Sequence, residues 1–146
     1  MIRPILTFEH PVLHQKARKV ARVDTSIQRL LDDLAETMLD APGAGLAANQ
    51  IGVPLRVCVV KGDENQIWGL VNPVIVKTAG TQVGYEGCLS KPGWVGEVER
   101  HEAVVDEHLA RADELERPHR DEARVARARA DDRDAHGRVS ATSCWK

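Results

Sequence analysis

The sequence is poor in aromatic residues, has no large excess of either charge and contains no long apolar run. Its 20 Lys and Arg face 22 Asp and Glu, which gives a formal net charge of −2. This balance lacks the basic surface with which proteins bind nucleic-acid phosphates, so we expect no direct nucleic-acid partner. No stretch approaches the ~18–20 apolar residues of a membrane-spanning helix, so we expect no membrane association. The apolar content of 42% predicts one soluble globular domain.

Cysteine is scarce, and its spacing argues against a disulfide framework. The three residues, Cys58, Cys88 and Cys144, are odd in number and far apart in the chain. Such a pattern favours a reducing compartment. The first residues also lack the basic start and the apolar run of a secretory signal peptide. We therefore expect a cytoplasmic protein.

The composition changes near Val105. Residues 106–146 hold 19 charged residues out of 41, and their few large apolar residues follow neither helical nor strand spacing. Pairs such as Glu107 and Arg111 would support a solvated helix, although each i,i+4 pair contributes only about 0.2–0.5 kcal/mol. We expect residues 1–105 to form a domain and residues 106–146 to form a weakly ordered, partly helical tail rich in Arg, Ala and Asp.

Upstream of this change, periodic apolar residues predict an α+β fold. Ile, Leu and Met recur at helical spacing over residues 27–38, between the capping residues 24–26 and the stop signal at 42–43, which predicts an amphipathic helix. Residues 55–60 and 67–71 predict the two strands of a hairpin. A helix followed by antiparallel strands is typical of this class. Shorter strands are predicted at residues 74–76, 81–83, 96–98 and 103–105.

Two glycine-containing segments are candidates for the functional site. In residues 43–50, small side chains would let a ligand backbone lie close to the protein backbone, with the Gln50 amide beside it. The alternative is a tight helix-to-strand connection with a surface Gln. In residues 85–90, Cys88 lies two residues after Glu86, and its thiolate would suit a metal ligand or a nucleophile. The alternative is a small buried hydrophobic residue.

Together these segments resemble motifs of the peptide deformylase family. Residues 43–50 match the motif GxGLAAxQ and residues 86–90 match EGCLS, in the family's order. The resemblance covers about residues 3–105 and implies a deformylase-like α+β domain. Further framework matches lie at residues 11–13, 51–54, 70–73, 92–93 and 98–100.

The resemblance implies a metal-dependent hydrolase that removes the formyl group from the N-terminal formyl-methionine of nascent proteins. In the family one Cys and the two His of a third motif, HExxH, hold ferrous iron, which zinc or nickel can replace, and a metal-bound water attacks the formyl carbon. The implied cofactor is therefore Fe2+, Zn2+ or Ni2+. The implied partner is an N-formylmethionyl nascent peptide, and we expect a monomer.

The family's site residues match six positions of this chain. Cys88 matches the metal-binding Cys. The side-chain amide of Gln50 and the backbone N–H of Leu89 match the donors that stabilise the formyl oxygen during attack, so these two are the catalytic candidates. Gly45 matches the glycine whose backbone pairs with the extended substrate. The substrate-binding candidates are Gly43, Gly45 and Gly87.

The third motif, HExxH, occurs nowhere in the 146 residues. His108 follows His101 by seven residues, which on a helix is too far for both imidazoles to reach one metal. We therefore expect His101 to be a surface or edge residue. His10 and His14 have the i,i+4 spacing, but Pro11 interrupts it and no Glu lies between them, so we expect these two to be solvated.

In the family a fairly constant number of residues separates the metal-binding Cys from the third motif. Counted from Cys88, this spacing places the third motif at residues 130–137 of this chain. There Ala130 and Asp134 would occupy the two His positions, and Asp131 would replace the catalytic Glu, which in the family carries the proton from water to the leaving amine. A methyl group supplies no ligand and a carboxylate is a harder donor than imidazole. We therefore expect the affinity for iron or zinc to fall steeply.

Three explanations stay open for the chain as a whole. The first is a deformylase-family protein whose reaction is impaired or lost, with residues 106–146 resembling a GC-rich gene read in a shifted frame, so that a charged tail replaces the central HExxH helix. The second is a non-catalytic relative that binds peptide N-termini without metal. The third is a cysteine hydrolase with Cys88 as its nucleophile and a His base.

Overall fold

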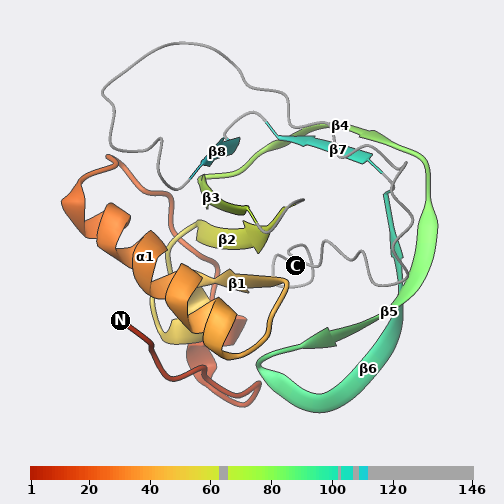
Figure 1. The fold of residues 1–146 in the computed structure, drawn as a ribbon, viewed down its shortest axis with the longest axis horizontal. Helices are drawn as coiled ribbons and strands as arrows, with labels where there is room; N and C mark the ends of the chain where they lie inside the picture. The colour runs from red at the N-terminus through yellow and green to blue at the C-terminus, as the bar shows by residue number, and fades with distance from the viewer. Residues whose placement is uncertain (63–65, 102, 107–108, 112–146) are drawn as a thin grey trace.

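The computed structural model describes residues 1–62, 66–101, 103–106 and 109–111, which form one α-helix, two short 3-10 helices and eight strands (Figure 1). All the strand pairings between these elements are antiparallel. The predicted α+β class is therefore confirmed. The elements are η1 Pro11–His14, α1 Thr25–Asp40, β1 Gly45–Ala47, η2 Ala48–Ile51, β2 Val57–Lys61, β3 Ile67–Val71, β4 Ile75–Ala79, β5 Gln82–Cys88, β6 Lys91–Arg100, β7 Ala103–Asp106 and β8 Leu109–Arg111.

The predicted amphipathic helix is α1. Its N-cap is Asp24, whose carboxylate accepts hydrogen bonds from the backbone N–H groups of Ser26 (2.9 Å) and Ile27 (3.3 Å). The helix ends at Asp40, just before the predicted stop signal. Its apolar stripe is buried and anchors the core, and it consists of Ile27, Leu31, Leu34 and Met38.

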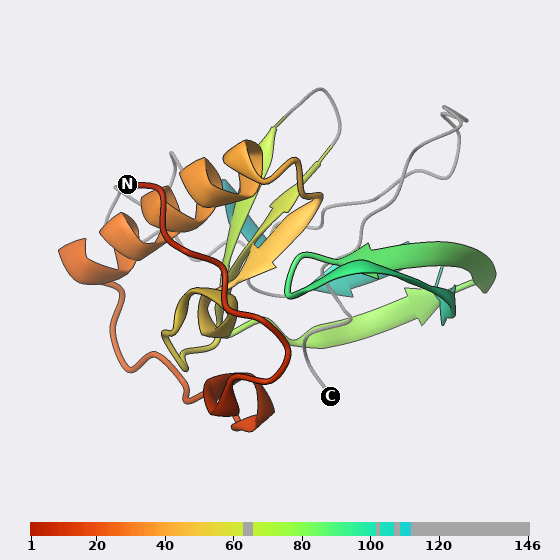
Figure 2. The same cartoon turned by 90° about the horizontal axis from the view of Figure 1, so that it is seen from below.

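A four-stranded sheet in the order β1-β2-β3-β8 packs on α1 (Figures 1 and 2). The predicted hairpin is confirmed as β2 and β3, with Val57 opposite Val71 and Lys61 opposite Ile67. Because successive side chains of a strand point to opposite faces, β2 contributes to two apolar clusters. Val57 and Val59 pack with the helix, whereas Cys58 and Val60 are buried on the other face.

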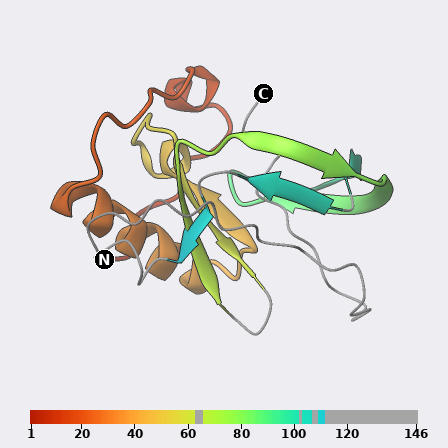
Figure 3. The same cartoon turned by 90° about the horizontal axis from the view of Figure 1, so that it is seen from above.

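The remaining strands form two separate ribbons, β4 with β7 and β5 with β6 (Figure 3). The short strands predicted at residues 74–76, 81–83, 96–98 and 103–105 fall within them or beside them, but β5 and β6 are much longer than predicted. Their length follows from pairing with each other over seven positions, from Gln82 opposite Arg100 to Cys88 opposite Lys91. Several large apolar side chains of these ribbons are exposed, namely Ile75, Val76, Val83, Tyr85, Trp94 and Val95.

The first part of the charged segment differs from its prediction. Leu109–Arg111 form β8, which pairs with β3 beyond the expected boundary at residue 105. Arg111 is in a strand rather than in a helix because the edge of β3 offers it main-chain partners. Residues 112–146, which include the counted positions Ala130, Asp131 and Asp134, lie outside the described residues. Within the described residues, no helix has the length and apolar character needed to cross a membrane.

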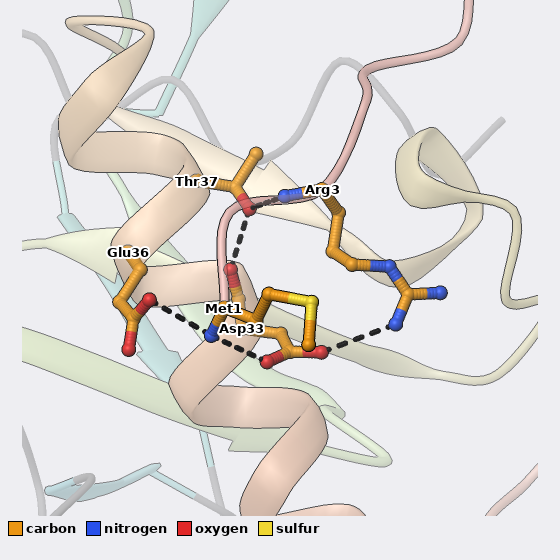
Figure 4. Close-up of polar contacts among 5 residues, drawn as sticks. All are labelled: Met1, Arg3, Asp33, Glu36 and Thr37. Atoms are coloured by element: carbon orange, nitrogen blue, oxygen red, sulfur yellow. Dashed lines mark hydrogen bonds and ion pairs between the residues drawn. The ribbon is translucent and has the colours of Figure 1, made fainter.

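The N-terminal segment is fixed to α1 by a cluster of polar contacts (Figure 4). The Met1 ammonium forms ion pairs with Asp33 (2.7 Å) and Glu36 (2.8 Å). The other Asp33 oxygen accepts a hydrogen bond from Arg3 at 3.2 Å. The hydroxyl of Thr37 accepts from the Arg3 backbone N–H (2.9 Å) and donates to the Asp33 carbonyl (2.6 Å). One helical carboxylate therefore binds two cations of this segment.

Replacing Asp33 by asparagine is expected to lower the melting temperature at neutral pH by about 2–3 °C, because exposed ion pairs are individually weak. The hydrogen bond from the Met1 ammonium is the largest of the causes that lower the pKa of Asp33 below 3.8. Because the pKa of Asp33 is lower in the folded protein than in the unfolded chain, Asp33 contributes its full share of the stability above the unfolded-state pKa. This stability is lost as the pH falls through the folded-state pKa. The difference between wild type and Asp33→Asn, followed by circular dichroism, should therefore vanish in acid. Asp32→Asn, a neighbouring change on the same helix, is the control.

Candidate functional site

Residues 43–50 pass from the end of α1 through β1 into η2. Gln50 lies in η2 and is only 3% exposed, so the alternative of a surface Gln is wrong. It is buried because its side chain turns back toward the start of its own turn, where the Oε1 atom accepts the Ala47 backbone N–H at 3.0 Å. A buried amide satisfied in this way has a fixed orientation.

The Gln50 side chain joins the two sequence motifs. Its Nε2 atom donates to the Ser90 hydroxyl at 3.1 Å, and the Cys88 sulfur lies 3.9 Å from the same nitrogen. The N-terminal segment connects the same two motifs through the main chain. Leu6 N–H donates to the Gln50 carbonyl and Phe8 N–H donates to the Ser90 carbonyl, both at 2.8 Å. These four contacts hold segments about forty residues apart against one another.

The second motif lies where β5 turns into β6. Cys88 is the last residue of β5, and Leu89 and Ser90 make the turn before Lys91 begins β6. Cys88 is half-buried, in contrast to Cys58, which is buried in the core, so only Cys58 fits the description of a small buried hydrophobic residue.

Gly43 permits the closest approach between the motifs. A Cβ atom built on Gly43 would lie 2.7 Å from the Leu89 Cδ1 atom, which is nearer than real Cβ contacts allow. A side chain at position 43 would therefore push Leu89 away.

Both motifs line one cavity of about 370 Å³. All six predicted site residues are on its wall, although their chemical roles stay predictions. Sequence reasoning missed the contributions of β6 to this wall, because they depend on the β5–β6 pairing and carry no motif. The lining residues are Pro42, Gly43, Ala44, Gly45, Leu46, Ala47, Gln50, Cys58, Glu86, Gly87, Cys88, Leu89, Lys91, Gly93, Trp94 and Val95.

Glu86 is held in the cavity wall by a two-point ion pair with Arg100 across the β5–β6 ribbon. The Arg100 Nε atom donates to one carboxylate oxygen at 3.1 Å and a terminal nitrogen donates to the other at 3.0 Å. The two side chains are 9% and 23% exposed, so the pair is shielded from water more than most surface ion pairs. The carboxylate charge is therefore already balanced within the ribbon.

The main chain of β1 offers a free edge beside the cavity. Among the described strands, β1 is at one end of its sheet, and its only strand partner is β2. The Ala44 carbonyl accepts from Lys61 N–H of β2, whereas Ala47 N–H points away from β2 to Gln50. Since alternate residues of a strand direct their main-chain groups to the same edge, Gly45 presents its N–H and C=O on the free side. An extended peptide can pair there.

The described residues do not fit a three-ligand metal centre. They contain no group of three or more His, Cys, Asp or Glu side chains placed to hold a metal ion. Cys88 is one suitable donor in the cavity wall. His101 is exposed between β6 and β7, as predicted. His10 and His14 are exposed as well, and they hydrogen-bond the main chain of their own segment, at Val12 N–H and the Phe8 carbonyl.

Comparisons with known proteins point to a single family. The family model described as polypeptide deformylase matches residues 2–131. A peptide deformylase of Dehalococcoides mccartyi strain CBDB1 is 50% identical over 111 residues, which are 75% of this chain and 66% of that protein. This chain therefore spans slightly less than two thirds of the length of that relative.

Solved structures agree with this match. The crystal structure of a peptide deformylase from Legionella pneumophila has a TM-score of 0.69 at 43% identity, covering 74% of this chain and 65% of that one. The Ehrlichia chaffeensis peptide deformylase in complex with actinonin has a TM-score of 0.70 at 32% identity, covering 73% and 67%.

Proposed function

The chain belongs to the peptide deformylase family, and from that membership we propose that it keeps the family's peptide-binding cleft while the family reaction is impaired or lost. That reaction is the metal-dependent hydrolysis of the N-formyl group from the N-terminal formyl-methionine of nascent proteins. The proposed ligand is accordingly an N-formylmethionyl peptide, met in the cytoplasm.

One observation carries the binding part of the proposal, namely that the two motifs share a cavity beside a free strand edge. The cavity of about 370 Å³ is large enough for one unbranched side chain with its flanking backbone. The Gly45 main chain would pair with the extended peptide, and the Gln50 amide, fixed by Ala47 and Ser90, would position the formyl group. The backbone N–H of Leu89 is the second proposed donor to the formyl oxygen.

The catalytic part of the proposal follows from the donor set. In the family a Cys and two His hold the metal, and the 146 residues contain Cys88 but no HExxH. The described residues around Cys88 do not complete a metal site, and the nearest carboxylate in the wall, Glu86, is held by Arg100. The described residues therefore supply one of the three ligands that the family uses, namely Cys88. Fe2+ remains the ion that the family implies, with weak binding expected here.

A second candidate function is supported by the same cleft. A non-catalytic relative would bind peptide N-termini without metal, using the β1 edge and the cavity alone. The fixed orientation of the Gln50 amide supports this candidate, because Ala47 and Ser90, both protein groups, hold it in the cavity wall.

The test combines binding, metal content and turnover in one preparation. Protein purified without oxygen is analysed for metals by mass spectrometry, for formyl-Met-Ala-Ser binding by calorimetry and for formate release. We expect micromolar binding, far less than one metal per chain and no turnover above background. Cys88→Ser removes the candidate ligand, and Cys58→Ala, which removes the other thiol of the cavity wall, is the matched control.

Each outcome is decisive. Close to one metal per chain, lost in Cys88→Ser but kept in Cys58→Ala and accompanied by turnover, would overturn the proposed loss of activity. Absence of peptide binding would overturn the proposal that the peptide-binding cleft is retained. Binding without turnover that is insensitive to chelators would support the second candidate.

A further inference from the structure

A single cationic side chain, Lys91, stands at the cavity wall. Of the lining residues, only Lys91 is basic and only Glu86 is acidic. Because Arg100 already binds both oxygens of Glu86, the charge of that carboxylate is balanced. No carboxylate of the described residues forms a salt bridge with Lys91. The described residues that line the cavity therefore carry a net positive charge, which is located on Lys91.

Two aromatic rings hold the Lys91 ammonium in place. Its nitrogen lies 4.2 Å from the centroid of the Trp94 ring and 5.0 Å from that of the Phe8 ring. Phe8 is kept beside Lys91 by the hydrogen bond from its N–H to the Ser90 carbonyl. Both rings are more than half exposed, at 67% and 51%, so the ammonium is at the mouth of the cavity rather than in its depth. The rings orient the cation but leave its charge uncompensated.

Glu9 is an acidic residue whose carboxylate interacts electrostatically with Lys91. Its pKa is lowered chiefly by hydrogen bonds from its own backbone N–H and from the Thr7 side chain, and Lys91 is the smallest of the causes. The Glu9 carboxylate thus accepts hydrogen bonds within its own segment, and it forms no salt bridge with Lys91 in the described part of the chain. A ligand carboxylate can therefore approach the ammonium directly.

We propose that Lys91 makes the cleft selective for peptides with a carboxylate on the third residue. The proposal rests on the function proposed above, in which an extended peptide pairs with β1. In an extended peptide alternate side chains share a face, so residue 3 faces the same side as the residue 1 side chain in the cavity, whereas residue 2 faces away. Lys91 lines that same cavity at its mouth. The recognised group is the side-chain carboxylate of Asp or Glu.

The test compares three peptides with amidated C-termini, so that no terminal carboxylate interferes. They are formyl-Met-Ala-Glu-Ser, formyl-Met-Glu-Ala-Ser and formyl-Met-Ala-Gln-Ser. By calorimetry at low salt we expect the first to bind about tenfold more tightly than the other two, and added salt should reduce the difference. Lys91→Met keeps an unbranched side chain against the Phe8 and Trp94 rings. In this variant the affinity for the first peptide should be close to the affinity for the other two. Lys91→Glu should reverse the preference.

Lys77→Met is the matched control, since Lys77 is an exposed residue of β4 that does not line the cavity. It should keep the tenfold ratio, and melting curves should show all three variants folded. Equal affinity of wild type for the three peptides, or a preference that survives in Lys91→Met, would overturn this inference alone. Failure of every peptide to bind wild type would overturn the proposed cleft and this inference together.

Discussion

Replacing Gln50 by alanine is expected to lower the free energy of unfolding by about 2 kcal/mol and to weaken formyl-peptide binding at least about tenfold. The stability loss arises because the buried Ala47 N–H and the Ser90 hydroxyl would both lose their partner. The binding loss arises because the same side chain fixes the cavity wall between the two motifs. Urea unfolding followed by circular dichroism measures the first effect and calorimetry measures the second.

Two further variants separate the contributions of Gln50. Ser90→Ala removes only the acceptor of the Nε2 atom and should cost about 1 kcal/mol. Gln82→Ala makes the same substitution at the exposed start of β5 and should change the stability by less than about 0.5 kcal/mol. If Gln50→Ala had the same urea midpoint of unfolding as wild type, the hydrogen bonds between the motifs would not contribute to stability.

Replacing Leu34 by alanine is expected to cost about 3 kcal/mol of unfolding free energy. Leu34 is fully buried, with 0% exposure, in the cluster between α1 and the β1–β2 side of the sheet. Its truncation removes apolar area from the core and leaves a cavity that the surrounding side chains fill only in part. Urea unfolding at fixed pH measures this loss. The unfolding free energy should depend on urea concentration with the same slope in wild type and Leu34→Ala, which would show that the unfolded state is unchanged.

Leu39→Ala is the matched control for Leu34→Ala. It makes the identical chemical change on the same helix, but Leu39 is 57% exposed, so the expected loss is below about 0.5 kcal/mol. Equal losses at the two positions would mean that α1 does not pack on the sheet as described.

The sequence allowed the helix and the central hairpin to be predicted because both have a long, regular apolar pattern. The stripe from Ile27 to Met38 repeats every three or four residues, and β2 and β3 are apolar runs on either side of a polar turn. The strand β1 and the turn η2 escaped prediction. Each has only three or four residues, and β1 is a strand because β2 offers it hydrogen-bond partners, which is a tertiary effect.

The candidate site was predicted in part. The two motifs indicated which residues form one wall of the cavity. They did not indicate that Gln50 is buried, because nothing in the sequence shows that its polar side chain has a buried partner such as Ser90. In the sequence Arg100 is only part of a framework match, because its pairing with Glu86 depends on the register of the β5–β6 ribbon. Lys91 and Trp94 reach the cavity for the same reason. Local patterns therefore indicate which residues to examine, and long-range pairing decides which of them meet.

The hydrogen bonds of the N-terminal segment have a consequence for the order of events during synthesis. Phe8 is made well before its acceptor, because Ser90 follows it by 82 positions. At a translation rate of ~5–20 residues per second, the two are separated by roughly 4–16 s. The helix and the β2–β3 hairpin are complete by Val71, so they can pack while Phe8 still lacks its acceptor. The packing of α1 on the hairpin therefore does not depend on the Phe8–Ser90 hydrogen bond, whereas the four-stranded sheet is complete only after β8, which is made later still.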